Sequence, residues 1–255
     1  MNEQNLDYLK SSLKRFGFED VLNADLEKAI KDGLETFELK HQATHFRDKI
    51  DYTLNFRKSD QSDMYFFNNY KADLITGNEA YNRSQVFYNN NGKGFSAQEA
   101  YNLLSGRAVH KEFAMKDSDK TYQAWAKLDF SKPDKSGFEI NRYHENYGYD
   151  LEKAIDRFPI KELEDPALKK GIISSLEKGN SQMVTMQTND QEAKFYVEAS
   201  PKGKTLNVRD ELYNLVKNET VQKPELKESK SAKSSKDIKK AKSEKEPSQS
   251  KGVSV

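Results

Sequence analysis

Hydrophobic residues follow two spacings along this chain, and the first of them predicts helices. Apolar residues three or four positions apart mark one helix face near the start: Leu6, Leu9, Leu13 and Phe16. Gly17 follows as a stop signal. A second short helix is predicted from Asp25, read as an N-cap, to Gly33. The chain therefore opens with two amphipathic helices.

The second spacing alternates apolar and polar residues and predicts strands. In 49–58, Tyr52, Leu54 and Phe56 alternate with polar neighbours, as one buried sheet face requires. Further strands are predicted at 35–44, 63–72, 84–89, 107–115, 121–130, 138–147, 181–188, 192–199 and 204–208. Three more helices fall between them: one after the capping box that begins at Ser96, one over 150–157, and one from Asp165-Pro166 to Gly179.

The order of these elements predicts an α+β fold, with mainly antiparallel sheets and flanking helices. Apolar residues occupy one side of 192–199, which is typical of an antiparallel sheet covered on one face. Strands and helices do not alternate regularly, so a doubly wound parallel sheet is not expected. We expect two small lobes, 1–105 and 106–217, followed by a different segment, 218–255.

The amino-acid composition excludes several classes of protein. Of 255 residues, 35% are hydrophobic and 33% are charged, and there is no Cys. No stretch reaches the roughly 18–20 apolar residues that cross a bilayer, and the polar start lacks the apolar core of a signal peptide. Without Cys, a disulfide scaffold, thiol catalysis and a thiolate zinc site are excluded. A soluble, cytoplasmic protein with no membrane association and no cofactor is expected.

The segment 218–255 is cationic and lacks aromatic residues. Its ten Lys and six acids give +4, so the remaining 217 residues carry −3 of the chain's total of +1. Such a composition predicts disorder. A flexible cationic arm can bind nucleic acid weakly through phosphate contacts. The candidate residues are Lys227, Lys230, Lys233, Lys236, Lys239, Lys240 and Lys242. The alternative is a solubilising tail whose acids cancel much of the field.

No motif predicts an enzyme or a metal site. His41 and His45 share a face of a predicted strand but would lie about 13 Å apart, too far for one metal ion. The serines lack a GxSxG pattern, and the chain has no HExxH motif. The turn Gly92-Lys93-Gly94 precedes a helix and makes Lys93 a weak candidate for an anion site. The favoured alternative is a plain turn leading into the capped helix.

Trp125 lies on the polar side of its predicted strand, together with Lys127. If that strand pairs with 138–147, Arg142 and His144 could join them in an aromatic and cationic surface suited to a partner or to single-stranded nucleic acid. The alternative, which is the commoner arrangement, is that a helix covers the indole.

Several runs of the sequence resemble those of one protein family. They are GKGFSAQEAYNLLSGRAV (92–109), AWAKLDF (124–130), YHENYGYDLEKAI (143–155), FPIKELEDP (158–166), SLEKGNSQMVT (175–185) and EASPKGKTLNV (198–208). These runs, with FRKSDQSDMYFFNNYKADL (56–74), resemble the uncharacterised domain of unknown function 3945, found in proteins of Bacteroidetes conjugative and other mobile elements. The resemblance implies a setting in DNA transfer and maintenance, because relatives are often joined to DNA-handling modules. It implies no reaction and no catalytic residues.

Together these observations predict a non-enzymatic accessory protein of a mobile genetic element, such as a conjugative transposon. Its body would be an interaction module, and its tail a weak, salt-sensitive tether to DNA. The alternative is a protein–protein module that engages a host factor or a conjugation protein. A third hypothesis is an enzyme with an unrecognised site.

Overall fold

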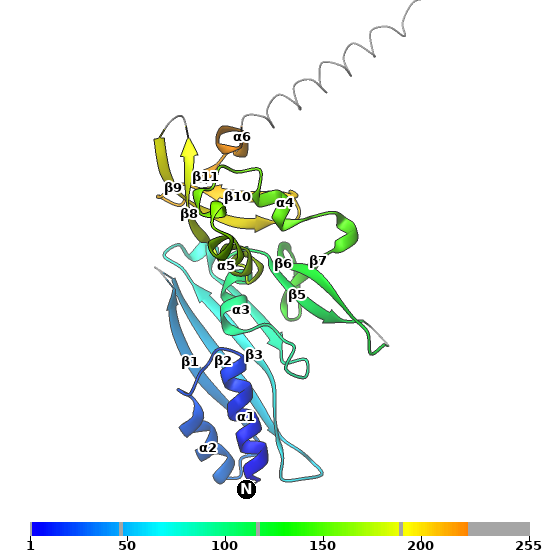
Figure 1. The fold of residues 1–255 in the computed structure, drawn as a ribbon. Coiled ribbons are helices and arrows are strands. Elements are labelled where there is room, and N and C mark those ends of the chain that lie inside the picture. Colours follow the sequence, from blue (N-terminus) through cyan, green and yellow to red (C-terminus); the bar gives the residue numbers. More distant parts are fainter. Residues whose placement is uncertain (1, 46–47, 116–117, 189–190, 224–255) are drawn as a thin grey trace, which may run out of the picture.

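The computed structural model describes residues 2–45, 48–115, 118–188 and 191–223. Within them the chain forms three antiparallel sheets with helices packed against them, so the predicted α+β class is confirmed (Figure 1). None of the helices in these ranges is long and apolar enough to cross a membrane.

The first sheet is a meander of four strands with helices on one face. Its strands pair in sequence order: β1 (Thr36–His45), β2 (Asp48–Lys58), β3 (Tyr65–Ile75) and β4 (Arg83–Tyr88). The helices are α1 (Glu3–Arg15), α2 (Asn23–Lys31) and α3 (Ala97–Leu104), and Figure 1 shows them along the same side of the sheet. One face of each strand is buried as the alternation predicts, because Tyr52, Leu54 and Phe56 are each at most 2% exposed.

The second sheet has three strands and the third has four. The second comprises β5 (Val109–Ala114), β6 (Thr121–Asp134) and β7 (Gly137–His144), with β6 in the centre. The third has the order β11 (Leu215–Val216), β10 (Thr205–Arg209), β9 (Gln191–Ser200) and β8 (Gln182–Thr188). Helices α4 (Leu151–Ile155) and α5 (Pro166–Glu177) connect the second sheet to the third. Short 3-10 turns occur at Glu79–Tyr81, Glu145–Tyr147 and Lys161–Glu164.

Two hydrophobic clusters form the core, and the second sheet contributes to both. Ala126 and Leu128 of β6 belong to the cluster under the first sheet. Trp125, which precedes Ala126 and points to the opposite face of β6, belongs to the cluster formed with α4, α5 and the third sheet. The division into lobes 1–105 and 106–217 stays a prediction, and the β5–β6–β7 sheet lies between the two clusters.

The predicted helix starts are correct in three cases and wrong in one, and the first of the three is α4, which Asp150 caps. Ser96 caps α3 in a complete capping box, and Asp165 caps α5, with Pro166 at its first position. Helix α2 instead begins at Asn23, which puts Asp25 in its first turn. The reason is that the preceding residue, Leu22, is buried in the core and starts the helix without a side-chain cap.

The predicted start of the disordered segment, at residue 218, is wrong by several residues. Helix α6 (Asn218–Val221) packs on the body, and Val221 is buried in the second cluster. Asn218 donates a side-chain hydrogen bond to the carbonyl of Leu206. The backbone N–H of Lys223 donates to the carbonyl of Arg157 at 3.0 Å. One aliphatic side chain and these hydrogen bonds suffice to hold the segment against the fold. Residues 224–255, and with them the rest of the predicted disorder, lie outside the described ranges.

Candidate functional site

The register of the β5–β6–β7 sheet separates the residues that were predicted to form one surface. Trp125 pairs with Tyr143, whereas His144 pairs with Ala124 and Arg142 pairs with Ala126. Directly paired residues point to the same face, and neighbours along a strand point to opposite faces. Trp125 and Lys127 therefore lie on one face, and Arg142 and His144 on the other. The prediction of a single surface is wrong, because Trp125 would share a face with Arg142 and His144 only in a register shifted by one residue.

Trp125 is a core residue. Its ring is 5.1 Å from that of His110 and 5.4 Å from that of Tyr149, and it is only 6% exposed. Lys127, on the same face, is partly buried, and this burial lowers its pKa, although the carboxylate of Glu198 opposes the shift. The indole is therefore covered, which is the alternative to an exposed contact surface given above.

The opposite face carries a ladder of stacked aromatic and cationic side chains. His144 stacks on Tyr122 with ring centroids 4.7 Å apart, and Tyr122 stacks on Phe113 at 5.8 Å. The guanidinium of Arg142 lies 4.8 Å from the centre of the Phe113 ring. We call Phe113, Tyr122, Arg142 and His144 the stacking platform. It joins π faces and positive charge in one patch.

Small residues in the central strand allow this arrangement. Arg142 on β7 and Phe113 on β5 are separated by β6, so they are two strand spacings apart, about 9.6 Å. The β6 residues between them on this face are Ala124 and Ala126, whose methyl groups leave room for the arginine to cross. A larger residue at either position would block the guanidinium.

The platform is accessible. Arg142 and His144 are exposed, while Phe113 and Tyr122 are partly exposed. Tyr122 and His144 line an open depression of about 740 Å³ together with Met115, Gln123 and Glu145, among others. Within the described ranges Arg142 has no carboxylate at ion-pair distance, so its charge is not neutralised by a fixed partner. Figure 1 shows the β5–β6 hairpin projecting from the side of the molecule, which keeps this end of the sheet uncovered.

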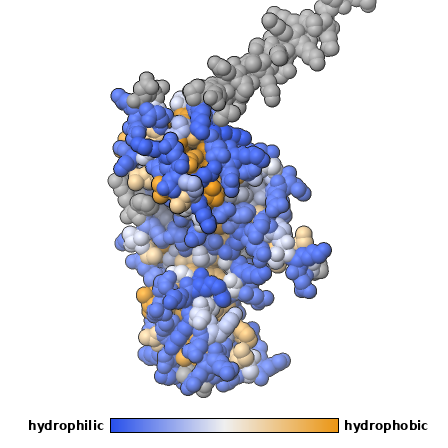
Figure 2. All heavy atoms as spheres, viewed as in Figure 1, coloured by the Kyte–Doolittle hydropathy of each residue, from blue (hydrophilic) through white to orange (hydrophobic). Residues whose placement is uncertain are grey.

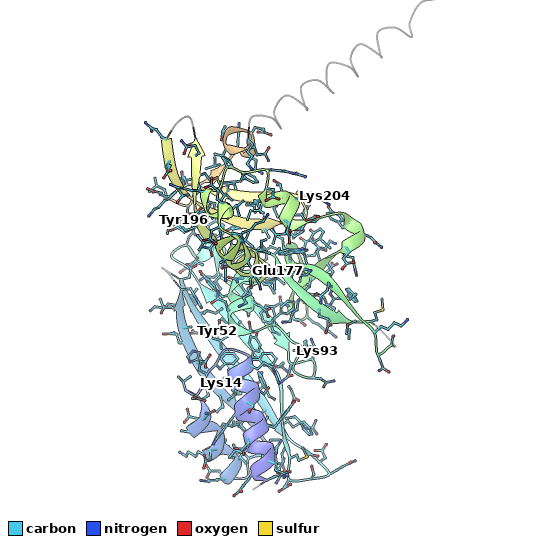
Figure 3. All side chains as sticks on the ribbon, viewed as in Figure 1. Lys14, Tyr52, Lys93, Glu177, Tyr196 and Lys204 are labelled. Carbon is cyan, nitrogen blue, oxygen red and sulfur yellow. The ribbon has the colours of Figure 1, made fainter. Side chains whose placement is uncertain are left out.

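Lys93 lies in a turn whose groups already have partners. Its ammonium forms an ion pair with Glu112 at 3.1 Å, and this contact lowers the pKa of the Glu112 carboxyl. The amide of Gly92 donates to the side chain of Asn89. Figure 3 shows Lys93 at the edge of the molecule. The arrangement matches the predicted alternative, a turn leading into the capped helix α3.

The histidines do not converge. His45 stacks on Tyr101 with centroids 4.1 Å apart, whereas His41 stacks on Tyr52 at 6.1 Å. Among the described residues there is no group of three or more His, Cys, Asp or Glu that could hold a metal ion. The seven candidate lysines from Lys227 to Lys242 lie outside the described ranges.

Sequence reasoning missed Phe113 and Tyr122. The alternation in 121–130 placed Tyr122 on the apolar side, which suggested a core residue. Its position in the sequence was a usable signal. Tyr122 directly follows the polar run 117–121, next to the hairpin turn, and the end of a strand beside such a turn often extends beyond the helices that pack on the sheet. Comparison with protein-family models, with curated proteins and with solved structures finds no match for the chain.

Proposed function

We propose that this protein is a non-enzymatic accessory protein that binds nucleic acid, with the stacking platform as its contact for unpaired bases. The observation that carries the proposal is the accessible ladder of Tyr122 and His144, flanked by the guanidinium of Arg142, which has no ion-pair partner among the described residues. The mobile-element setting comes from the resemblance to the domain of unknown function 3945 and is part of the proposal.

A stacking platform selects single strands for a physical reason. Every base has a π face, and stacking on an aromatic side chain contributes about 1–3 kcal/mol per base regardless of sequence. In a duplex these faces are covered by neighbouring base pairs. Arg142 adds both a cation for the phosphate backbone and a planar group for stacking.

The charge balance indicates that the platform does not act alone. Residues 1–217 carry a net −3, whereas 218–255 carry +4. An anionic body gains little from long-range attraction to phosphates. The Lys-rich segment would supply the sequence-independent, salt-sensitive part of the affinity, and the platform would supply the preference for unpaired bases.

The test is fluorescence anisotropy with a labelled oligothymidine and the full-length protein. Replacing Tyr122 by Ala should weaken binding at least about fivefold, because Tyr122 is the middle ring that supports His144, and the free face of His144 would lose its place for a base, a contact of about 1 kcal/mol or more. Tyr88→Ala is the matched control, because this tyrosine is 51% exposed on β4 of the first sheet. Equal affinity of the two variants would refute a role for the platform.

The dependence of the affinity on salt concentration separates the contribution of the Lys-rich segment from that of the stacking platform. Deleting 224–255 should flatten the dependence of affinity on salt concentration, while the effect of Tyr122→Ala should persist in the shortened chain. The deletion removes none of the residues in the two hydrophobic clusters. If neither single-stranded nor double-stranded DNA binds at 50 mM salt, the proposal fails.

A protein partner is the second candidate function, and one feature favours it. Leu212, just before the short strand β11, is 83% exposed, and Leu215, the first residue of that strand, is 66% exposed. Figure 2 shows apolar side chains gathered on the end of the molecule formed by the third sheet. Binding of a protein there would survive deletion of 224–255 and would not respond to Tyr122→Ala.

A further inference from the structure

The other face of the β5–β6–β7 sheet borders a second concavity, of about 460 Å³, next to α4 and α5. Three aromatic side chains contribute to its wall, namely His110, Trp125 and Tyr149. Four carboxylates line it as well, namely Asp150, Glu152, Asp156 and Glu177, against the single ammonium of Lys153. We call it the acidic concavity. Aromatic rings beside carboxylates form a site suited to a cationic side chain.

Two of the four carboxylates remain available. Asp150 is paired with Lys153, and Asp156 is paired with Lys169, each at 2.9 Å. Among the described residues the ion-pair partner of Glu177 is the imidazole of His110, at 3.9 Å, and burial lowers the pKa of that histidine, which favours its neutral form. Glu152 has no cation at ion-pair distance among the described residues. The concavity therefore presents uncompensated negative charge.

The described part of the chain ends beside this concavity. The amide of Lys223 is hydrogen-bonded to the carbonyl of Arg157, the residue that follows Asp156 on the concavity wall. The 32 residues that continue from this point, 224–255, contain nine lysines and five acids. A cationic segment thus starts where an anionic site lies.

We propose that the acidic concavity binds the chain's own segment 227–242 through its lysines. Since the same lysines are the proposed phosphate contacts, this inference rests in part on the proposed function: docking would hold the segment away from nucleic acid. The concavity would then be an autoinhibitory site, from which phosphates displace the lysines.

The distances permit the contact. Lys227 is four residues beyond Lys223, and an extended chain of that length spans up to about 13 Å. Glu152 and Ile155 are three residues apart in α4, about 4.5 Å along the helix axis, and Arg157 lies two residues further on, at most about 7 Å away. The first lysine of the segment therefore reaches the carboxylates, and the next ones follow at three-residue steps.

Trp125 provides a direct test, because it is the only Trp of the chain and it lines the concavity. Its quenching by acrylamide is measured in the full-length protein and in the protein ending at residue 223, without nucleic acid. Because only 6% of Trp125 is exposed, its quenching constant is small in both proteins. At 50 mM salt it should be lower in the full-length protein, because docked side chains cover the exposed edge of the indole. At 1 M salt, where the Debye length is about 3 Å, the difference should vanish.

Charge-neutralising variants identify the site. The double variant Glu152→Gln, Glu177→Gln should abolish the difference and raise the affinity of the full-length protein for oligothymidine about threefold or more. The control is Glu35→Gln, Glu38→Gln, which makes the same charge change at two exposed positions, one just before β1 and one within it, and should alter neither result.

Three outcomes would overturn the inference. These are equal quenching with and without 224–255, a difference that persists in the Glu152, Glu177 variant, and a difference that grows with protein concentration, which would assign the segment to a second copy. Because the quenching experiment contains no nucleic acid, it can succeed even if the stacking platform binds none.

Discussion

Asn102 of α3 links the part of the molecule around the first hydrophobic cluster to the chain that follows α5, in the part around the second cluster. Its replacement by Ala should destabilise the whole fold. The side chain is fully buried. Its amide donates to the carbonyl of Lys178 at 2.6 Å and to the side chain of Asn180 at 2.9 Å. Its oxygen accepts from the guanidinium of Arg107 at 2.6 Å, and that arginine is only 8% exposed.

The expected loss follows from these three contacts. Two neutral hydrogen bonds contribute about 1 kcal/mol each, and a hydrogen bond to a charged group contributes about 1.5–3 kcal/mol. Arg107 keeps its bond to the carbonyl of Gly179, so its charge is not left wholly unpaired. Asn102→Ala should therefore lower the free energy of unfolding by about 4 kcal/mol.

Urea unfolding followed by two signals tests this prediction. Far-ultraviolet circular dichroism reports on all three sheets, whereas the fluorescence of Trp125 reports on the second cluster alone. With a urea dependence of about 2.5 kcal/mol per molar, the midpoint should fall by about 1.6 M. This conversion requires that the two signals give the same midpoint, so coincidence of the two transitions is checked in both proteins.

Gln98→Ala is the control for this experiment. Gln98 donates to the same side chains, Asn102 and Asn180, but its bonds are longer, at 3.2 and 3.3 Å, and one of them is exposed. Its loss should cost less than about 1 kcal/mol. A loss below about 1.5 kcal/mol for Asn102→Ala would refute the argument that this buried junction couples the two halves.

Three further substitutions have expected outcomes that thermal melts can check. Gly179→Ala should destabilise by about 2 kcal/mol or more, because φ is +80° and a Cβ would lie 2.8 Å from the carbonyl oxygen of Ala108. Ser96→Ala removes the N-cap of α3 and should cost about 1 kcal/mol. Tyr70→Phe leaves the buried carbonyl of Phe95 without its 2.7 Å hydrogen bond and should cost about 1–2 kcal/mol. At this size each kcal/mol lowers Tm by about 2–4 °C, and a rise in Tm for any of them would contradict its mechanism.

Most elements could be predicted from local patterns, because the signals that define them are local. Alternation, capping residues and glycine stops lie within a few positions of each other, as the complete capping box at Ser96 illustrates. The start of α2 could not be found in this way. Leu22 begins that helix because the core holds it, and a side-chain cap is absent.

Neither the stacking platform nor the acidic concavity could be located from the sequence, because both depend on how β6 is covered. Alternation divides β6 into two sets of residues but does not say which set meets a neighbour. Trp125 is on the polar set yet is buried, since α4, α5 and the third sheet close over it. Tyr122 is on the apolar set yet is accessible, since α3 contacts only part of the sheet.

The same strand thereby places opposite charges on its two sides. The Ala residues of β6 let Arg142 and the aromatic rings spread over one face, while the Trp125 side meets helices rich in carboxylates. A cationic segment and an anionic nucleic acid would consequently be bound on opposite faces of one three-stranded sheet, without steric conflict. The lysines of 227–242 would couple the two binding events, because a lysine that contacts a phosphate can no longer bind in the acidic concavity. The competition we propose needs no change in the fold, only a shared set of charges.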